Sequence, residues 1–174
     1  MKFIPLLFCL IILVPLAVAG SSMAPWVPTR KKDIKKLVDI LDLKAWDVFF
    51  EIWCWDWRVS HSVAKAFPKA KILGLELAYP MFIFAYLRWI LYPVKNYKVT
   101  LWNAFKKDFS AYDVIYVYGM PDKMWAKIVP KFLSEAKSWA KLYSYVFSIP
   151  EEYRKEVVTH GAPDEAKIHV LEKK

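Results

Sequence analysis

Hydrophobic residues along the chain follow two alternating patterns. Short continuous apolar runs are typical of strands that are buried on both faces of a parallel sheet. Between them lie stretches with helical spacing, such as the one in which Val59, Val63, Ala64 and Phe67 share one side. We expect strands at residues 47–52, 71–77, 99–101, 113–118 and 140–147. The alternation predicts an α/β fold in which helices cover both faces of a mostly parallel sheet.

Two further elements flank this alternation. Before the first strand, Thr29 can cap a helix whose apolar side carries Ile34, Leu37, Val38 and Leu41, and we expect this helix to pack beside the first strand. After the fifth strand, residues 152–158 and 167–172 predict a terminal hairpin. About 150 residues follow the N-terminal segment, which is enough for one domain with a sizeable core.

The N-terminal segment is strongly apolar. Phe3 to Gly20 holds no charged residue, and its 18 residues are near the lower limit for crossing a bilayer. Ala17-Val18-Ala19 resembles a cleavage site, so a cleaved export signal stays an alternative. Because five basic residues lie within 30–36 and only Lys2 precedes the segment, we favour a retained transmembrane helix with the domain on the cytoplasmic side. We divide the chain into an anchor (1–22), a linker (23–30) and a domain (31–174).

The segment after the first predicted strand is the most unusual part of the chain. It reads Glu-Ile-Trp-Cys-Trp-Asp-Trp-Arg from Glu51 to Arg58. A turn between a parallel strand and a helix needs backbone conformations open mainly to glycine, and it lets a ligand approach the main chain. A tryptophan forced to positive φ costs about 1–2 kcal/mol, and overpacking adds about 1–3 kcal/mol. Three such residues would threaten a domain that is stable by only about 5–15 kcal/mol.

With glycine in place of Trp53, Trp55 and Trp57, this segment resembles the first motif of the class I S-adenosylmethionine-dependent methyltransferases, which have a Rossmann-like sheet. The second strand ends near Glu76, 25 residues after Glu51, where an acid can accept hydrogen bonds from ribose hydroxyls. The resemblance implies S-adenosyl-L-methionine as cofactor. It assigns Glu51 and the 53–57 loop to the methionine part, Glu76 to the ribose and Asn103, where the family usually has Asp, to the adenine. The cofactor-binding candidates are Glu51, Trp53, Cys54, Trp55, Trp57, Glu76 and Asn103.

The acceptor side is predicted after the fourth strand, at the carboxyl edge where open α/β sheets bind ligands. The candidates there are Tyr118, Gly119, Met120 and Pro121. Methyl transfer is an in-line displacement in which the protein mainly positions two partners and excludes water, so few acid-base groups are required. No single catalytic residue can be named from the sequence.

A more specific resemblance starts at the leader. An apolar segment followed by Ala-Pro-Trp-Val-Pro-Thr (24–29) is similar to the membrane-anchored protein-lysine methyltransferases, whose mitochondrial members modify the ATP synthase c subunit and the adenine nucleotide translocator. The similarity runs to about Pro150. It implies a protein-lysine substrate, for which a membrane protein is one candidate, with the N-terminal helix holding the enzyme at the membrane, and we expect a monomer.

Tryptophan stands on other positions where that family has glycine. These are Trp46 and Trp139, each where the family has Lys-Pro-Gly, Trp102 after the third strand and, more weakly, Trp125. The chain has nine Trp and four Gly, whereas an average usage of about 7 per cent predicts roughly 12 Gly. We hypothesise that these seven tryptophans are UGA codons, which some bacterial lineages read as glycine. The alternative is a genuine, degenerate protein with an aromatic cluster.

The remaining features leave other functions open. The net charge of +9 admits RNA, anionic lipid or an acidic protein as partner, although lysines scattered along helices are more often a solvated face. The Asn-Pro-Pro-Tyr motif typical of enzymes that modify amino groups on nucleobases is missing after the fourth strand, which makes nucleic acid a weaker alternative to protein. A methyltransferase of RNA or small molecules, and a non-catalytic binding protein if the indoles are genuine, remain as alternatives. The cysteines and histidines show no metal-ligand spacing, and Cys54 is read as loop lining because no nearby base is set by the sequence.

Overall fold

The structure, a computed structural model, describes residues 28–119 and 121–174, together with residues 9 and 13. The predicted anchor and most of the predicted linker lie outside the described residues, and so does Met120. Within the part of the chain that is described, no helix has both the length and the apolar character needed to span a bilayer. The transmembrane helix therefore stays a prediction.

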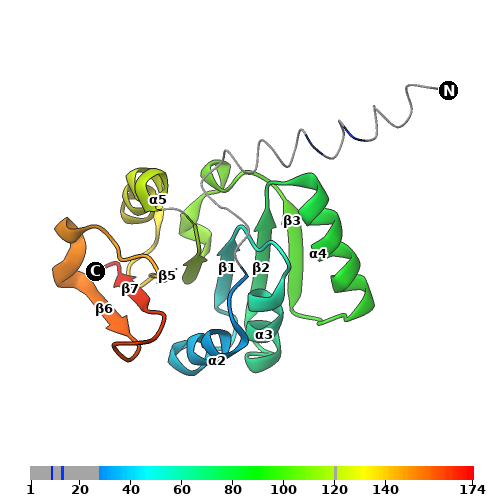
Figure 1. Ribbon diagram of the computed structural model, residues 1–174, viewed down its shortest axis with the longest axis horizontal. Helices are drawn as coiled ribbons and strands as arrows, with labels where there is room; N and C mark the ends of the chain where they lie inside the picture. Colours follow the sequence, from blue (N-terminus) through cyan, green and yellow to red (C-terminus); the bar gives the residue numbers. More distant parts are fainter. Residues whose placement is uncertain (1–8, 10–12, 14–27, 120) are drawn as a thin grey trace.

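A seven-stranded sheet forms the centre of the fold, with the strand order β3-β2-β1-β4-β5-β7-β6 (Figure 1). The strands are β1 (Val48–Ile52), β2 (Lys71–Glu76), β3 (Tyr97–Leu101), β4 (Val114–Val117), β5 (Lys141–Tyr145), β6 (Val157–His160) and β7 (Ile168–Glu172). β1 to β5 run parallel, whereas β7 is antiparallel to both β5 and β6. All five strands predicted by the apolar runs are confirmed. The order reverses between β1 and β4, which is where open α/β sheets bind their ligands.

Helices cover both faces of this sheet, as predicted. The α-helices are α2 (Lys31–Ile40), α3 (Arg58–Ala66), α4 (Tyr79–Leu91) and α5 (Pro121–Glu135), and short 3-10 helices cover Ala104–Lys106, Phe109–Ala111 and Glu151–Glu156. Because side chains alternate along a strand, β1 sends Phe49 into a buried cluster with α2 and α3, and Phe50 into a second cluster with α5. The core therefore consists of two layers, one on each side of the sheet.

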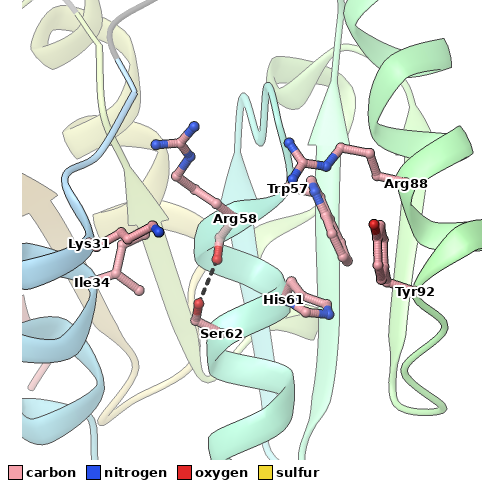
Figure 2. Close-up of a pocket in the computed structure, with 8 residues that line it drawn as sticks. All are labelled: Lys31, Ile34, Trp57, Arg58, His61, Ser62, Arg88 and Tyr92. Atoms are coloured by element: carbon pink, nitrogen blue, oxygen red, sulfur yellow. Dashed lines mark hydrogen bonds between the residues drawn. The ribbon is translucent and has the colours of Figure 1, made fainter.

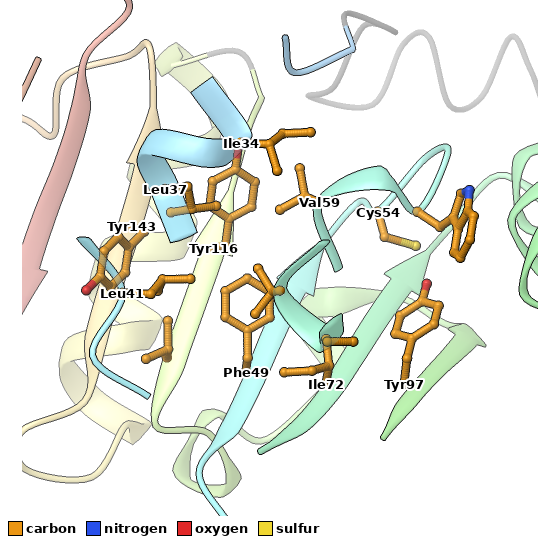
Figure 3. Close-up of a cluster of buried hydrophobic side chains, with 14 of the residues drawn as sticks. Ile34, Leu37, Leu41, Phe49, Cys54, Val59, Ile72, Tyr97, Tyr116 and Tyr143 are labelled. Atoms are coloured by element: carbon orange, nitrogen blue, oxygen red, sulfur yellow. The ribbon is translucent and has the colours of Figure 1, made fainter. Parts of the chain in front are cut away.

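The first described helix packs as expected but begins differently. Ile34, Leu37 and Leu41 of α2 lie in the same cluster as Phe49 of β1 (Figure 3). The predicted cap by Thr29 is wrong, because Arg30 holds the N-cap position and makes no side-chain cap hydrogen bond. The Thr29 side chain is instead buried, with its hydroxyl 3.3 Å from the hydroxyl of Tyr116. The Thr29 side chain thus holds the start of the described domain against Tyr116 of β4, and it does not cap the helix.

The terminal hairpin is confirmed in kind, although its first strand is shorter than predicted. Residues 152–156 belong to the 3-10 helix Glu151–Glu156, and pairing with β7 begins only at Val157. This hairpin closes the β5 side of the sheet, because β7 pairs with β5 along its whole length.

Five tryptophans lie in the left-handed region of the backbone. Their φ angles are 76° at Trp46, 59° at Trp53, 44° at Trp55, 65° at Trp57 and 69° at Trp139. Trp102 and Trp125, which the family resemblance also placed on glycine positions, do not have positive φ. Only glycine enters this region without a steric penalty, so five of the seven positions have a backbone that favours glycine. Val146 also has a positive φ, of 71°, where no glycine is expected.

Trp46 and Trp139 show that packing does not account for the left-handed residues. Their side chains are 76% and 73% exposed, so the indoles contribute little burial in return for the strain. The Trp46 N–H donates to the Lys69 carbonyl at 2.9 Å, and the Trp139 N–H donates to the Lys173 carbonyl at 2.6 Å. These two hydrogen bonds hold the turns in place. The conformation is therefore required by the connections of the sheet and not by the side chain.

We predict that Trp46→Gly and Trp139→Gly each stabilise the chain as written by about 1 kcal/mol, because glycine removes the left-handed penalty and little burial is lost. Urea unfolding of the single variants measures this change. Trp102→Gly is the matched control, since Trp102 is 51% exposed and its φ is not positive. A gain at position 102 equal to that at 46 and 139 would contradict the backbone explanation.

Candidate cofactor site

The candidate site is built around the loop that joins β1 to α3. Two hydrogen bonds from backbone N–H groups hold this loop against the end of β2: Cys54 N–H donates to the Leu75 carbonyl at 2.8 Å, and Trp55 N–H donates to Glu76 Oε2 at 3.0 Å. A third closes the loop on itself, from Trp57 N–H to the Cys54 carbonyl at 2.7 Å. The alternate left-handed residues at 53, 55 and 57 let the chain make this tight path. The loop geometry is thus that of a ligand-binding turn, with side chains where such turns leave space.

The indoles of Trp53 and Trp57 are buried on opposite sides of the sheet. Trp53 is 6% exposed and joins the α5-side cluster, with its ring 6.4 Å from Phe105. Trp57 is 3% exposed, and its ring lies 3.8 Å from that of His61 and 6.2 Å from that of Tyr92. Figure 2 shows the three side chains beside one another. The Trp57 Nε1 is buried with no hydrogen-bond partner among the described residues. A buried N–H without a partner is costly, so this packing is not that of an optimised core.

Little space remains in the crevice itself. A cavity of about 20 Å³ lies between Glu51, Trp53, Trp55 and Tyr118, beneath the chain at Thr29. That is room for about one water molecule. A larger pocket of about 430 Å³ lies beyond Trp57 and is lined by Lys31, Ile34, Trp57, Arg58, His61, Ser62, Arg88 and Tyr92 (Figure 2). Because a site for a drug-sized ligand is roughly 300–1,000 Å³, a nucleoside cofactor does not fit the crevice with the indoles in place.

Glu51 is the most perturbed acid of the site. It is 4% exposed at the end of β1, and its Oε2 accepts hydrogen bonds from the Ser60 N–H at 2.9 Å and the Ser60 hydroxyl at 2.5 Å. Burial raises the pKa of the Glu51 carboxyl from 4.5 to about 8, and the nearby charges of Asp56 and Glu76 act in the same direction, against the hydrogen bonds from Ser60. A buried acid that is neutral at pH 7 is poised to ionise when a cation arrives beside it.

Glu76 lies where the sequence placed the ribose acid. Its Oε1 accepts from the N–H groups of Leu77 at 2.8 Å and Ala78 at 2.7 Å, while its Oε2 accepts from Trp55. Burial raises the pKa of Glu76, and the three backbone hydrogen bonds partly oppose that rise. The carboxylate is therefore held rigidly at the carboxyl end of β2, next to the loop.

The next two cofactor candidates are Asn103, which follows β3, and Cys54, which lines the small cavity of the crevice. The Asn103 side chain caps the 3-10 helix Ala104–Lys106 by accepting from the Phe105 N–H at 2.9 Å. Cys54 is 2% exposed, and burial raises the pKa of its thiol well above the ordinary value. Such a thiol is a poor nucleophile, which agrees with its interpretation as loop lining.

On the acceptor side, aromatic rings gather at the ends of β4 and β5. Tyr118 lines the same cavity as Glu51, and its ring lies 4.8 Å from that of Tyr145 and 6.2 Å from that of Phe147. The Tyr145 hydroxyl donates to Asp33 of α2 at 2.7 Å, which fixes that ring. The sequence argument named Tyr118 but missed Tyr145 and Phe147, although both lie at the end of a predicted strand. Gly119 follows Tyr118 and Pro121 is the first residue of α5, while Met120 is outside the described residues.

Comparison with known proteins finds similarity to methyltransferases. No protein-family model matches the chain. A curated relative, a protein-lysine N-methyltransferase of Saccharolobus islandicus, is 25% identical over 140 residues, which cover 77% of this chain and 83% of that protein.

Solved structures share the fold at low sequence identity. An RNA methyltransferase from Salinibacter ruber, in complex with S-adenosyl-L-homocysteine, has a TM-score of 0.74 at 18% identity and covers 84% of this chain and 93% of its own. A precorrin-6y C5,15-methyltransferase from Geobacter metallireducens has a TM-score of 0.66 at 14% identity, covering 87% and 93%. The chain therefore has the fold of the class I S-adenosylmethionine-dependent methyltransferases.

Proposed function

We propose that the protein transfers a methyl group from S-adenosyl-L-methionine to the side-chain amine of a protein lysine at a membrane. The observation that carries the proposal is the left-handed loop at positions 53–57, hydrogen-bonded to Glu76 at the topological switch point of the sheet. The named activity of the Saccharolobus relative supports lysine as acceptor. The apolar leader (1–22) supports the membrane.

The proposal requires glycine in the loop of the natural protein. We propose that positions 46, 53, 55, 57 and 139 are UGA codons read as glycine in the organism of origin, because each has a backbone conformation that favours glycine. Positions 102 and 125 rest only on the family resemblance. UGG codons at 53, 55 and 57 in the gene would defeat this reading.

With glycine at those positions, the described residues match the cofactor in chemistry. The sulfonium donor, when bound, supplies an activated methyl group. Glu51 would stand beside the positively charged methionine part, where a cation favours the ionised carboxylate and lowers its raised pKa. Glu76 would accept from the ribose hydroxyls and Asn103 would lie at the adenine.

The acceptor must be presented as a neutral amine. Tyr118, Tyr145 and Phe147 offer an aromatic wall beside the cavity, and such a wall disfavours the charged ammonium by excluding water. Removing solvent and holding the amine in line are the tasks left to this chain, since methyl transfer itself needs little acid-base help.

Two alternatives have specific support. The RNA methyltransferase among the structural neighbours and the net charge of +9 favour an RNA acceptor on the same scaffold. If the indoles are genuine, the cavity of about 20 Å³ favours a non-catalytic protein.

We predict that the variant with Trp53, Trp55 and Trp57 all changed to Gly binds S-adenosyl-L-methionine, and that the chain as written binds it at least about 100-fold more weakly, because two buried indoles must otherwise be displaced. Isothermal calorimetry measures both. Adding Glu76→Ala to the glycine variant should cost about tenfold or more, since charge-assisted hydrogen bonds to the ribose are lost. Equal affinity of the Trp and Gly forms for S-adenosyl-L-methionine would contradict the steric explanation. If neither form binds it, the non-catalytic alternative is favoured.

We predict that the free energy of unfolding of the ligand-free chain contains a term that falls as pH rises from about 4.5 to about 8. Unfolded Glu51 ionises near 4.5 but folded Glu51 near 8, so in that window the folded state binds more protons; the slope is at most about 1.4 kcal/mol per pH unit. Urea unfolding across this range, compared with Glu51→Gln, isolates the term. An unchanged pH profile in Glu51→Gln would refute a neutral Glu51.

We predict that the glycine form, in sealed membrane vesicles of its host, methylates lysine in a membrane protein, and only when radiolabelled donor reaches the cytoplasmic face. Inverted vesicles should therefore be labelled and right-side-out vesicles should not. Tyr118→Ala should lower incorporation about tenfold while Tyr118→Phe keeps most of it, because the ring is retained. Label in RNA would favour the first alternative, and labelling from the outer face would refute the cytoplasmic orientation.

A further inference from the structure

The outward face of α4 is apolar over its whole length. Within this 13-residue helix only Ala85 is fully buried, and Arg88 is the sole charged residue. The exposed apolar residues, here called the α4 face, are Tyr79, Ile83, Phe84, Tyr86, Leu87, Ile90, Leu91 and Tyr92, with exposed fractions from 39% to 70%. A surface helix normally presents polar residues to water, and a contiguous exposed apolar patch marks an interaction site.

The α4 face lies on the flank of the molecule. α4 packs along the edge strand β3 and β2, and Figure 1 shows it at one end of the sheet, opposite the terminal hairpin of β6 and β7. It is the outer surface of a single helix and therefore convex. None of its residues belongs to the loop at 53–57, but the Tyr92 ring lies 6.2 Å from that of Trp57, so the surroundings of this one end depend on the residue at position 57.

Charge around the α4 face has one sign. From residue 77 to residue 107 the chain carries five basic residues and no acidic one. Lys95 and Lys98 are exposed just beyond the end of α4, and the Lys107 ammonium lies 5.4 Å from the centre of the exposed Trp102 ring. An apolar helix face bordered by basic side chains matches a surface that combines hydrocarbon with negative charge.

The distribution of residues within the face points to lipid. Tyrosines stand at both ends, at Tyr79 and Tyr92, while the middle holds Ile83, Leu87 and Ile90 together with the aromatic Phe84 and Tyr86. Tyrosine prefers the headgroup level of a bilayer and aliphatic side chains prefer the acyl region below it. A convex face also suits a fluid bilayer, which needs no matching groove as a protein partner would.

We propose that the α4 face rests on the surface of a bilayer that contains anionic lipids. α4 begins directly after Glu76, at the carboxyl edge of the sheet, so this contact would hold the candidate cofactor site close to the headgroups. The α4 face would be a second membrane contact in addition to the leader. If the protein methylates lysine, which rests on the proposed function, this contact favours acceptor lysines near the membrane surface. Its test reads the α4 face directly and so stays independent of methyl transfer.

The test uses the full chain carrying Cys9→Ser, so that a single new cysteine can be labelled; Cys54 is buried and does not compete. Leu87→Cys and Ile90→Cys each place an environment-sensitive fluorophore on the α4 face, at sites 52% and 53% exposed. Val158→Cys is the matched control, since Val158 is 59% exposed on β6 at the far edge of the sheet. The detergent-solubilised protein is diluted into vesicles of phosphatidylglycerol and phosphatidylcholine, or of phosphatidylcholine alone.

We expect labels at 87 and 90 to brighten several-fold on vesicles with phosphatidylglycerol and to be quenched by nitroxide-bearing lipid, while the label at 158 stays unchanged. Lys95→Gln and Lys98→Gln should each weaken the response about fivefold, because each removes an attraction to anionic headgroups. The proposal is overturned if the label at 158 responds equally, which assigns all binding to the leader. It is also overturned if the labels at 87 and 90 are already shielded from water before vesicles are added. Shielding that is independent of protein concentration would show that the leader covers the α4 face. Shielding that grows with protein concentration would show that a second copy of the chain covers it.

Discussion

The backbone between β1 and α3 must pass through three left-handed residues within five positions, and the rest of the site depends on that path. The loop is held by hydrogen bonds to Leu75 and Glu76 of β2, so it cannot relax without losing those bonds. Left-handed backbone is open to glycine and strained for tryptophan. The conformation is thus imposed by the sheet, and the side chains at 53, 55 and 57 have to accommodate it.

This constraint explains why the site combines the right acids with too little space. Glu51 and Glu76 end adjacent strands and converge on the loop, which is the arrangement for binding a cationic nucleoside at the switch point. The Trp53 and Trp57 indoles enter the two core layers, one on each side of the sheet. Each indole lies beside the loop, in space that a bound ligand would need. Burial raises the pKa of the Glu51 carboxyl to about 8, and perturbed acids of this kind are typical of functional sites.

Much of this architecture was predictable because each core strand is a continuous apolar run. Such runs can be recognised in the sequence even where the loops between them cannot be interpreted. The positions of Glu51 and Glu76 followed from their place at strand ends. Five of the seven positions where glycine was expected have a positive φ, whereas Trp102 and Trp125 do not. A family motif gives the expected residue type, but it does not give the φ angle of the residue in a divergent chain. Thr29 failed as a cap because its hydroxyl meets Tyr116, 87 residues away, and sequence alone does not show such a partner.

The outer side of α4 lay beyond sequence reasoning for a related reason. An apolar helix is equally consistent with a core or a membrane surface until its neighbours are known, and only the fold leaves Ile83, Leu87 and Ile90 facing outward. The aromatic wall was overlooked because Tyr145 and Phe147 read as strand core. Tertiary proximity to Tyr118 gives them their place beside the crevice.

The most direct test of the account is the mass of one tryptic peptide from the protein isolated from the cells that make it. Cleavage after Lys44 and Arg58 releases residues 45–58, which contain positions 46, 53, 55 and 57. The account predicts a peptide in which all four are glycine, lighter than the written sequence by four indole side chains. A peptide of the written mass, with four tryptophans, would contradict it.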